Sequence, residues 1–152
     1  MRSAILLVYA LAIVSAAHAE DPPAAQKAVE IRQSIFKLLG WNFSPTIGPM
    51  MANKVKFDAA VVQKNAARLE ALAPMIPDAF VLDTHQTPGL KTRARAAIWA
   101  NMADFKAKDD DLVKAAMTLV NVAKSGDETT FRPAALAVSQ ACRACHDTFR
   151  DD

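Results

Sequence analysis

FRPAALAVSQACRACHDTFR, residues 131–150, repeats apolar or small side chains at steps of four and three residues. This spacing puts the side chains on one face of an α-helix. The face consists of Phe131, Ala135, Val138, Cys142, Cys145 and Phe149. The stretch therefore predicts an amphipathic helix that carries both cysteines of the chain.

Pro133 restricts where this helix begins. Proline lacks an N–H and its ring clashes with the carbonyl four residues earlier, but the first turn of a helix has no intrahelical partners for its N–H groups. We therefore expect the helix to begin at Thr129 or Thr130. A start at Asp127 should leave a kink at Pro133.

Residues 22–43 predict a first helix. Two prolines suit its start, and the segment 44–49, with two further prolines, should end it. Its apolar side chains recur at helical spacing. They are Ala28, Ile31, Ile35 and Leu38.

A second helix should begin with Asp58 as its N-cap, because an aspartate oxygen accepts a hydrogen bond from an N–H of the first turn. It should end near Pro74 or Pro77. Its apolar side chains are Val61, Val62, Leu69 and Leu72. The composition of residues 77–89 then predicts a long loop.

Residues 91–124 predict a third helix, which Gly126 ends as a C′ glycine. Its apolar stripe, nearly a heptad seam, consists of Ile98, Met102, Phe105, Leu112, Ala116, Leu119 and Ala123. We assign Met102 to packing rather than to ligand binding. Four helices, one long connection and no alternating β pattern predict an all-α fold, an antiparallel four-helix bundle.

The first nineteen residues have the pattern of a cleaved secretory signal peptide. An arginine precedes the apolar run 4–14, and Ala17 and Ala19 give the small-residue spacing of a signal-peptidase site. We expect an exported domain over residues 20–152. Losing Arg2 lowers the net charge of +2 by one, which gives no reason to expect nucleic acid or a membrane as partner after cleavage.

Cys142, Cys145 and His146 stand at i, i+3 and i+4 and project from one helical face. C-x-x-C-H is the attachment pattern of c-type haem. Two thiols one turn apart can each add to a porphyrin vinyl group, and the adjacent imidazole then ligates the iron. The motif therefore predicts one haem c, bound covalently through Cys142 and Cys145, with His146 as the iron ligand.

Three other roles for the cysteines are weaker alternatives. A disulfide between the two within one helix would be strained. A thiol–disulfide oxidoreductase would need a βαβ context with the thiols at a helix N-terminus, whereas this motif ends an all-helical chain. A zinc site would need a fourth ligand, and the other histidine of the mature chain is His85, in the predicted loop.

The sequence resembles cytochrome c′, a family of four-helix haem proteins of bacterial periplasms. The resemblance spans the mature chain. It is carried by AVEIRQSIFKLL (28–39), RAAIWANMADFKAK (95–108) and GDETTFRPAALAVSQACRACHDTFR (126–150). It implies a periplasmic protein with a five-coordinate, high-spin haem whose only protein ligand is His146.

The resemblance also implies roles for four further residues. Arg32 and Gln33 lie by the haem propionates, and Phe36 faces the vacant side of the iron, with core packing as its alternative role. Arg150 lies near the proximal imidazole, with the helix dipole and last carbonyls as its alternative partners. Low-spin relatives place a methionine in the first helix, and residues 27–43 contain none.

These features predict a haem protein rather than an enzyme. An apolar pocket admits NO and CO and disfavours anions and water, so we expect NO buffering or detoxification, with one-electron transfer. The alternative is a six-coordinate, low-spin electron carrier of the same fold, with a methionine or lysine as sixth ligand. A thiol–disulfide oxidoreductase is less favoured.

The expected partners are NO, CO and a small redox protein. By resemblance, a second copy of the chain should pack through the first two helices to form a homodimer. The candidate contacts are Val29, Ile35, Leu39 and Val62, although the core of a bundle needs the same residues.

Overall fold

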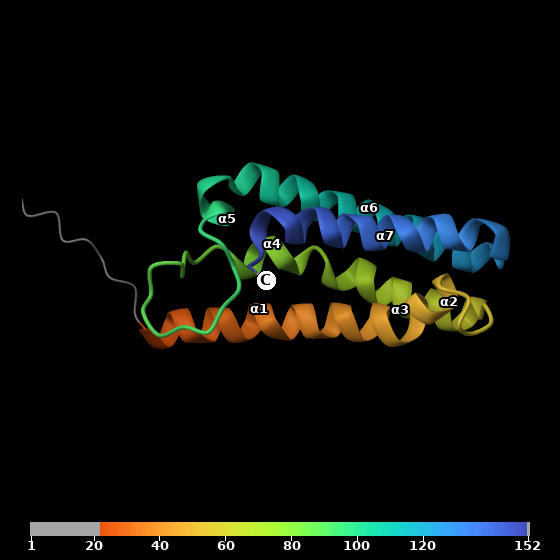
Figure 1. Ribbon diagram of the computed structural model, residues 1–152, viewed down its shortest axis with the longest axis horizontal. Coiled ribbons are helices and arrows are strands. Elements are labelled where there is room, and N and C mark those ends of the chain that lie inside the picture. Colours follow the sequence, from red (N-terminus) through yellow and green to blue (C-terminus); the bar gives the residue numbers. More distant parts are fainter. Residues whose placement is uncertain (1–21, 152) are drawn as a thin grey trace, which may run out of the picture.

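The computed structural model describes residues 22–151, and over that range four long helices form a bundle (Figure 1). They are α1 (Pro22–Asn42), α3 (Ala59–Leu72), α6 (Met102–Ser125) and α7 (Glu128–Phe149). The short elements are the π-helical η1 (Phe43–Ile47) and the α-helical segments α2 (Gly48–Met51), α4 (Met75–Ala79) and α5 (Ala97–Ala100). The expected all-α four-helix bundle is confirmed. The expected signal segment 1–19 lies outside the described residues.

Helix α6 holds the bundle together, because it packs against both α7 and α3, while α1 packs against α3 and α4. The apolar stripe expected on the third helix is buried as predicted, and Met102 packs against the core at its edge. Ile98 of that stripe is buried from α5. No helix within residues 22–151 combines the length and apolarity that crossing a bilayer requires.

The proline-containing segment 44–49 does not end the first helix as expected. The chain stays helical to Met51, because η1 takes up one wide π-helical stretch and α2 begins with a proline in its first turn. A proline in the first helical turn removes an N–H that would have no intrahelical partner, and a π-helical stretch shifts the regular hydrogen-bond pattern at Pro45.

The apolar residues whose spacing predicted α1 do not all face the core. Ile35 lies in the core, but Ile31 and Leu38 are 47% and 45% exposed. Arg32 and Val29 are buried instead. Apolar residues occur on two sides of this helix, so their spacing predicts a helix but does not say which side meets the bundle.

The ends of the middle elements confirm some expectations and correct others. Asp58 caps α3, since its Oδ1 accepts a hydrogen bond from the Val61 N–H at 3.0 Å. Pro77 lies inside α4, so the long loop begins after Ala79 rather than at residue 77. The third helix does not begin at residue 91: α5 starts at Ala97, and Asn101, with φ −141° and ψ 62°, separates α5 from α6.

Both ends of the α6–α7 connection follow from local chemistry. Gly126 has φ 70° and ends α6, as predicted for a C′ glycine. Asp127 caps α7 by accepting a hydrogen bond from the Thr129 N–H at 2.8 Å, so α7 begins at Glu128, earlier than Thr129 or Thr130. Pro133 therefore lies inside the helix. The carbonyl of Thr129 lacks its usual N–H partner there, and the kink stays a prediction.

Two leucines of the bundle differ in burial and allow a matched test of the core. Leu119 on α6 is fully buried, whereas Leu136 on α7 is half-exposed. We expect Leu119→Ala to lower the free energy of unfolding by about 2–5 kcal/mol, because it leaves a cavity. Leu136→Ala should change it by roughly 0.5 kcal/mol or less. Urea unfolding of the haem-containing protein, followed by far-UV circular dichroism, measures both, and equal losses would contradict this packing.

Candidate haem site

A cavity of about 940 Å³ lies between α1 on one side and α6 and α7 on the other. Apolar side chains from the three helices form most of its wall, and α3, α4 and α5 contribute Leu69, Ile76 and Ile98. The volume is at the upper end of the range for small-molecule and cofactor sites. The structure brings together at this cavity all the site residues expected from the sequence: Arg32, Gln33, Phe36, Cys142, Cys145, His146 and Arg150.

Cys142, Cys145 and His146 lie in the last two turns of α7, and all three side chains are partly buried at the cavity wall. Both thiols are free of disulfide bonding. The i, i+3, i+4 spacing therefore presents two thiols and an imidazole to one apolar space, as covalent attachment and axial ligation of a haem require.

The carboxyl end of α7 is fastened to the segment just before α5. The Arg95 N–H donates to the Phe149 carbonyl at 3.0 Å, and the Asp151 N–H donates to the Arg93 carbonyl at 2.9 Å. The Arg95 side chain donates to the carbonyls of Asp147 and Thr148 and pairs with Asp151 at 2.8 Å. Cationic donors at the carboxyl end of a helix bind the carbonyls that lack an intrahelical partner, and they interact favourably with the negative end of the helix dipole. These interactions therefore hold in place the helix end that carries the C-x-x-C-H motif.

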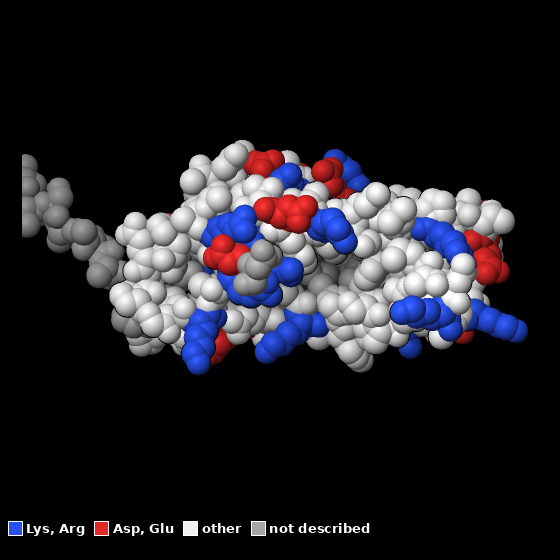
Figure 2. Space-filling model, viewed as in Figure 1, with Lys and Arg blue, Asp and Glu red and all other residues white. Residues whose placement is uncertain are grey.

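Sequence analysis missed Arg93 and Arg95 because the basic run KTRAR, residues 91–95, was assigned to a helix. The signal was present, since clustered arginines outside a helix are suited to binding the carbonyls at a helix C-terminus. Figure 2 shows Lys and Arg side chains close to Asp and Glu around the end of the chain, so this face carries both signs of charge.

The thiols are poorly suited to redox catalysis. Burial raises the pKa of Cys142, and burial followed by the nearby charge of Asp109 raises the pKa of Cys145 to about 11. A reactive thiol needs the opposite shift, because the thiolate is the nucleophile. The geometry thus gives no support to a thiol–disulfide oxidoreductase.

Arg150 lies beside the imidazole, as its i+4 position leads us to expect. Its Nη1 is 3.3 Å from His146 Nε2. Burial, and then the positive charge of Arg150, lower the pKa of His146. The neutral imidazole, which is the form that binds a metal, is therefore favoured. Whether Arg150 governs access to that side of the iron stays a prediction.

Arg32 is buried in α1 and fastens the loop that follows α4. Its guanidinium donates hydrogen bonds to the Ala79 carbonyl and the Thr84 hydroxyl at 2.6 Å each, and to the Leu82 carbonyl. It also lies 4.5 Å from the centroid of the Phe80 ring. A planar, five-donor guanidinium suits such a set of acceptors.

Gln33 acts on the same loop further along, where its Nε2 donates to the Lys91 carbonyl at 2.8 Å. Both polar side chains of α1 thus line the cavity while they bind the loop beside it. The contact of Arg32 and Gln33 with haem propionates stays a prediction.

Phe36 stands on the α1 wall of the cavity and is 38% exposed. Its ring meets the edge of Phe80, with centroids 6.2 Å apart. Among the described residues no methionine lines this cavity, although Lys37 and Lys108 do. The α1 wall facing the motif is therefore mostly apolar.

Trp99 and Phe149 have packing roles. The Trp99 indole donates to the Phe80 carbonyl at 2.8 Å, and Phe149 is buried against Phe105 with ring centroids 5.3 Å apart. His85 binds Asp83 and stacks on Trp99. Within the described range no group of three or more His, Cys, Asp or Glu side chains converges as metal ligands would, so the zinc alternative gains no support.

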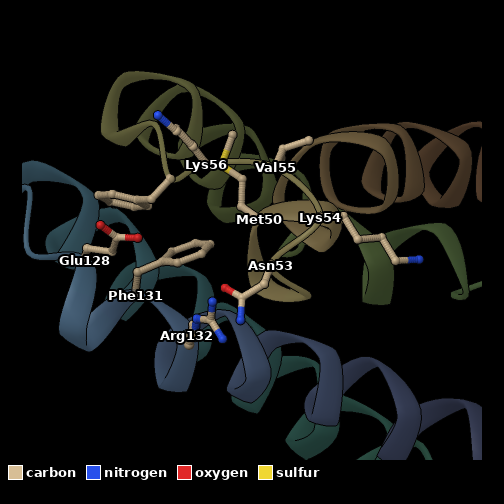
Figure 3. A pocket seen from close by; sticks show the side chains of 9 residues that line it. Met50, Asn53, Lys54, Val55, Lys56, Glu128, Phe131 and Arg132 are labelled. Atoms are coloured by element: carbon tan, nitrogen blue, oxygen red, sulfur yellow. The ribbon is translucent and has the colours of Figure 1, made fainter.

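A second, smaller pocket of about 310 Å³ lies between the segment after α2 and the start of α7 (Figure 3). Its wall includes Met50, Phe131, Lys54 and Lys56. Figure 3 shows the two lysine ammonium groups pointing away from the space between Met50 and Phe131. The charged groups do not converge, so this pocket lacks the features of a cofactor site.

A helical bundle whose last helix presents two free thiols and a neutral imidazole to an apolar cavity has the features of a c-type haem protein. The family model described as Cytochrome C′ matches residues 27–150. The chain therefore belongs to the cytochrome c′ family. It carries one covalent haem c, and it is a haem protein rather than an enzyme.

Individual relatives agree with this assignment. Cytochrome c′ of Rubrivivax gelatinosus is 34% identical over 124 residues, which cover 82% of this chain and 94% of the relative. The structure of cytochrome c prime from Shewanella frigidimarina is 32% identical, covers 88% of this chain and 98% of that one, and has a TM-score of 0.77. The nitric oxide complex of a leucine-to-isoleucine mutant of the Alcaligenes xylosoxidans protein is 30% identical, covers 84% and 97%, and has a TM-score of 0.74.

The hydrogen bonds of Arg32 predict a measurable effect on the loop. Arg32→Lys should lower the free energy of unfolding by about 1–3 kcal/mol, because an ammonium cannot reach all three acceptors. Amide hydrogen exchange in residues 81–90 should become faster. Arg68→Lys is the matched control, since Arg68 is exposed and has one longer hydrogen bond, 3.3 Å to Asn42. Unchanged exchange in the Arg32 variant would contradict the role assigned to this side chain.

Proposed function

We propose that the chain is a periplasmic haem protein that binds NO and CO at an open axial position of a five-coordinate haem. His146 is its only protein ligand to the iron, and its role is to buffer or detoxify NO, with one-electron transfer as an accompanying activity. The bound haem supplies reversible binding of diatomic gases and one-electron redox chemistry. The observation that carries the proposal is the α1 wall of the cavity, which faces the motif and, over the described residues, offers no methionine.

The residues of that wall favour small neutral ligands. Phe36, Val29 and Leu39 line it with apolar surface, and desolvating water or an anion there without a hydrogen-bond partner is costly. Two polar side chains of this wall are engaged, since Arg32 donates to the end of α4 and to the loop after it, and Gln33 donates to the same loop further along. Because these two donors are engaged, the apolar part of the α1 wall favours NO and CO over O₂.

Relatives with bound NO support this reading. The nitric oxide complex of the Alcaligenes xylosoxidans mutant, and a ferrous variant of the same protein with bound NO, share the fold of this chain. The transfer of that ligand to this chain is our proposal.

A six-coordinate electron carrier is the second candidate, and one observation favours it. Lys37 and Lys108 line the cavity. Lys108 lies 3.9 Å from the Asp104 carboxylate on its own helix. Lys37 is next to Phe36 on α1, so it is the side chain that has to be tested as a sixth ligand.

Optical spectra of the dithionite-reduced haem protein, with and without CO, distinguish the two candidates. We expect a broad high-spin Soret band that sharpens and shifts with CO. Phe36→Ala should raise the association rate of CO and NO by roughly tenfold, equivalent to about 1.4 kcal/mol in the barrier, because the ring crowds the pocket.

Ser34→Ala, at an exposed position of α1 that does not line the cavity, is the control and should leave the rate unchanged. The six-coordinate alternative predicts a different result. The wild type would then show sharp low-spin bands that do not change with CO, and the bands of Lys37→Ala would change with CO.

We also propose a homodimer, but not through the contacts expected from the sequence. Val29, Ile35 and Val62 are buried in the chain's own core and Leu39 lines the cavity, so these four residues are unavailable to a partner. Apart from Phe36 at the cavity, the large apolar side chains that α1 exposes are Ile31, Leu38 and Trp41. An exposed apolar face of this kind suits a two-fold contact with a second copy.

Leu38→Glu should convert the dimer to a monomer in sedimentation velocity, because a two-fold contact buries the new charge twice. Leu136→Glu, which changes an equally exposed leucine on α7, should leave the dimer intact. A monomeric wild-type protein would contradict the proposal directly.

A further inference from the structure

Asp109 interrupts the apolar stripe of α6. The buried seam runs through Phe105 and Leu112, and the position between them, four residues after the first and three before the second, holds Asp109. Its side chain is 6% exposed. Its Oδ1 is buried and has no hydrogen-bond partner in the described part of the chain. A core position with an unpartnered carboxyl oxygen is unfavourable unless function requires it.

The carboxyl group lies at the haem cavity. Asp109 lines the cavity together with Cys145, one of the two attachment cysteines, and is close enough for its charge to raise the pKa of that thiol. Its neighbours Asp110 and Asp111 are exposed. Of three consecutive aspartates, the chain therefore directs only the first toward the cofactor.

The charged and titratable groups around this cavity come from several elements. Leu69, Ile76 and Ile98, from α3, α4 and α5, do not titrate. The charged and titratable groups come from α1, from the segment before α5, from α6, and from α7 and the residue after it. They are Arg32, Lys37, Arg93, Lys108, Cys142, Arg143, Cys145, His146, Asp147 and Arg150. Burial, and then the charge of Asp110, raise the pKa of Asp109 to about 7. The carboxyl group is thus poised to change protonation near neutral pH.

We propose that Asp109 is a proton-binding site coupled to the redox state of the haem. When an external one-electron donor reduces the ferric iron to ferrous, the Asp109 carboxylate takes up one proton from water, and it releases that proton on oxidation. One electron and one proton enter together, so the net charge of the cavity is unchanged. The inference rests on the bound haem and not on the gas that it binds.

The direction of the coupling follows from electrostatics. An ionised carboxylate in a poorly solvated wall stabilises the more positive ferric state, whereas the protonated form does not. Reduction removes that stabilisation, so the carboxyl group binds its proton more tightly in the ferrous protein. The midpoint potential should therefore fall as pH rises through the neutral range.

Spectroelectrochemical titration of the haem protein between pH 5 and pH 9 tests this. The wild type should show a segment that approaches about 59 mV per pH unit, the one-electron equivalent of a tenfold change in equilibrium constant. In Asp109→Asn this segment should be absent. The potential of the variant should match the wild type at acid pH and exceed it at alkaline pH, whereas a purely structural change would displace the curve at both ends.

Two neighbouring substitutions serve as controls. Asp111→Asn removes the same charge from an exposed position and should leave the pH-dependent segment in place. Asp110→Asn removes the charge that raises the pKa of Asp109, so the segment should move to lower pH. An unchanged segment in Asp109→Asn would overturn the proposal and assign the proton to another group.

Infrared difference spectroscopy keeps the test independent of the variant's folding. At neutral pH, reduction of the wild-type protein should produce a carboxylic acid C=O band that shifts in D₂O, and Asp109→Asn should lack this band. A wild-type spectrum without any carboxylic acid band would overturn the proposal. Neither measurement uses NO or CO, so its failure is distinct from a failure of the proposed ligand binding.

Discussion

The side of the bundle between α1 and α7 does not close by direct helix packing. Helix α6 packs against α3 and α7, and α1 packs against α3 and α4, but α1 and α7 face each other across the cavity. Apolar walls that meet nothing are unfavourable in water. A covalent haem in this cavity would cover both walls, and the motif, Phe36 and Asp109 all line this one side.

The connection between α4 and α5 contacts both helices that face each other across the cavity, α1 and α7. At its start, the loop after α4 is bound by Arg32, and at its end the segment before α5 binds the last turn of α7 through Arg93 and Arg95. These hydrogen bonds join groups 47 to 58 positions apart in the sequence. Residues 79–95 thereby link α1 to the end of α7 through hydrogen bonds.

Local signals in the sequence predicted what depends on local chemistry. The thiols and imidazole share one face because helical geometry requires it. Asp58 caps the start of α3 through its side chain, and Gly126 ends α6 through its backbone conformation. The sequence did not say which face of α1 points inward, because Ile31 and Leu38 are as apolar as Ile35, and only the partner helices decide between them. Asp109 was passed over because the stripe was identified from its apolar members. Read strictly as a heptad, the same stripe requires a buried residue there.

The raised pKa values of the two cysteines also lower the reactivity of their sulfur atoms. Because its pKa is raised to about 11, Cys145 is almost entirely a thiol rather than a thiolate at pH 7. Oxidants and foreign disulfides react with the thiolate, so burial slows the oxidation of these sulfur atoms. The same burial slows the addition of the sulfur atoms to the haem vinyl groups, because the thiolate is the reactive form there as well.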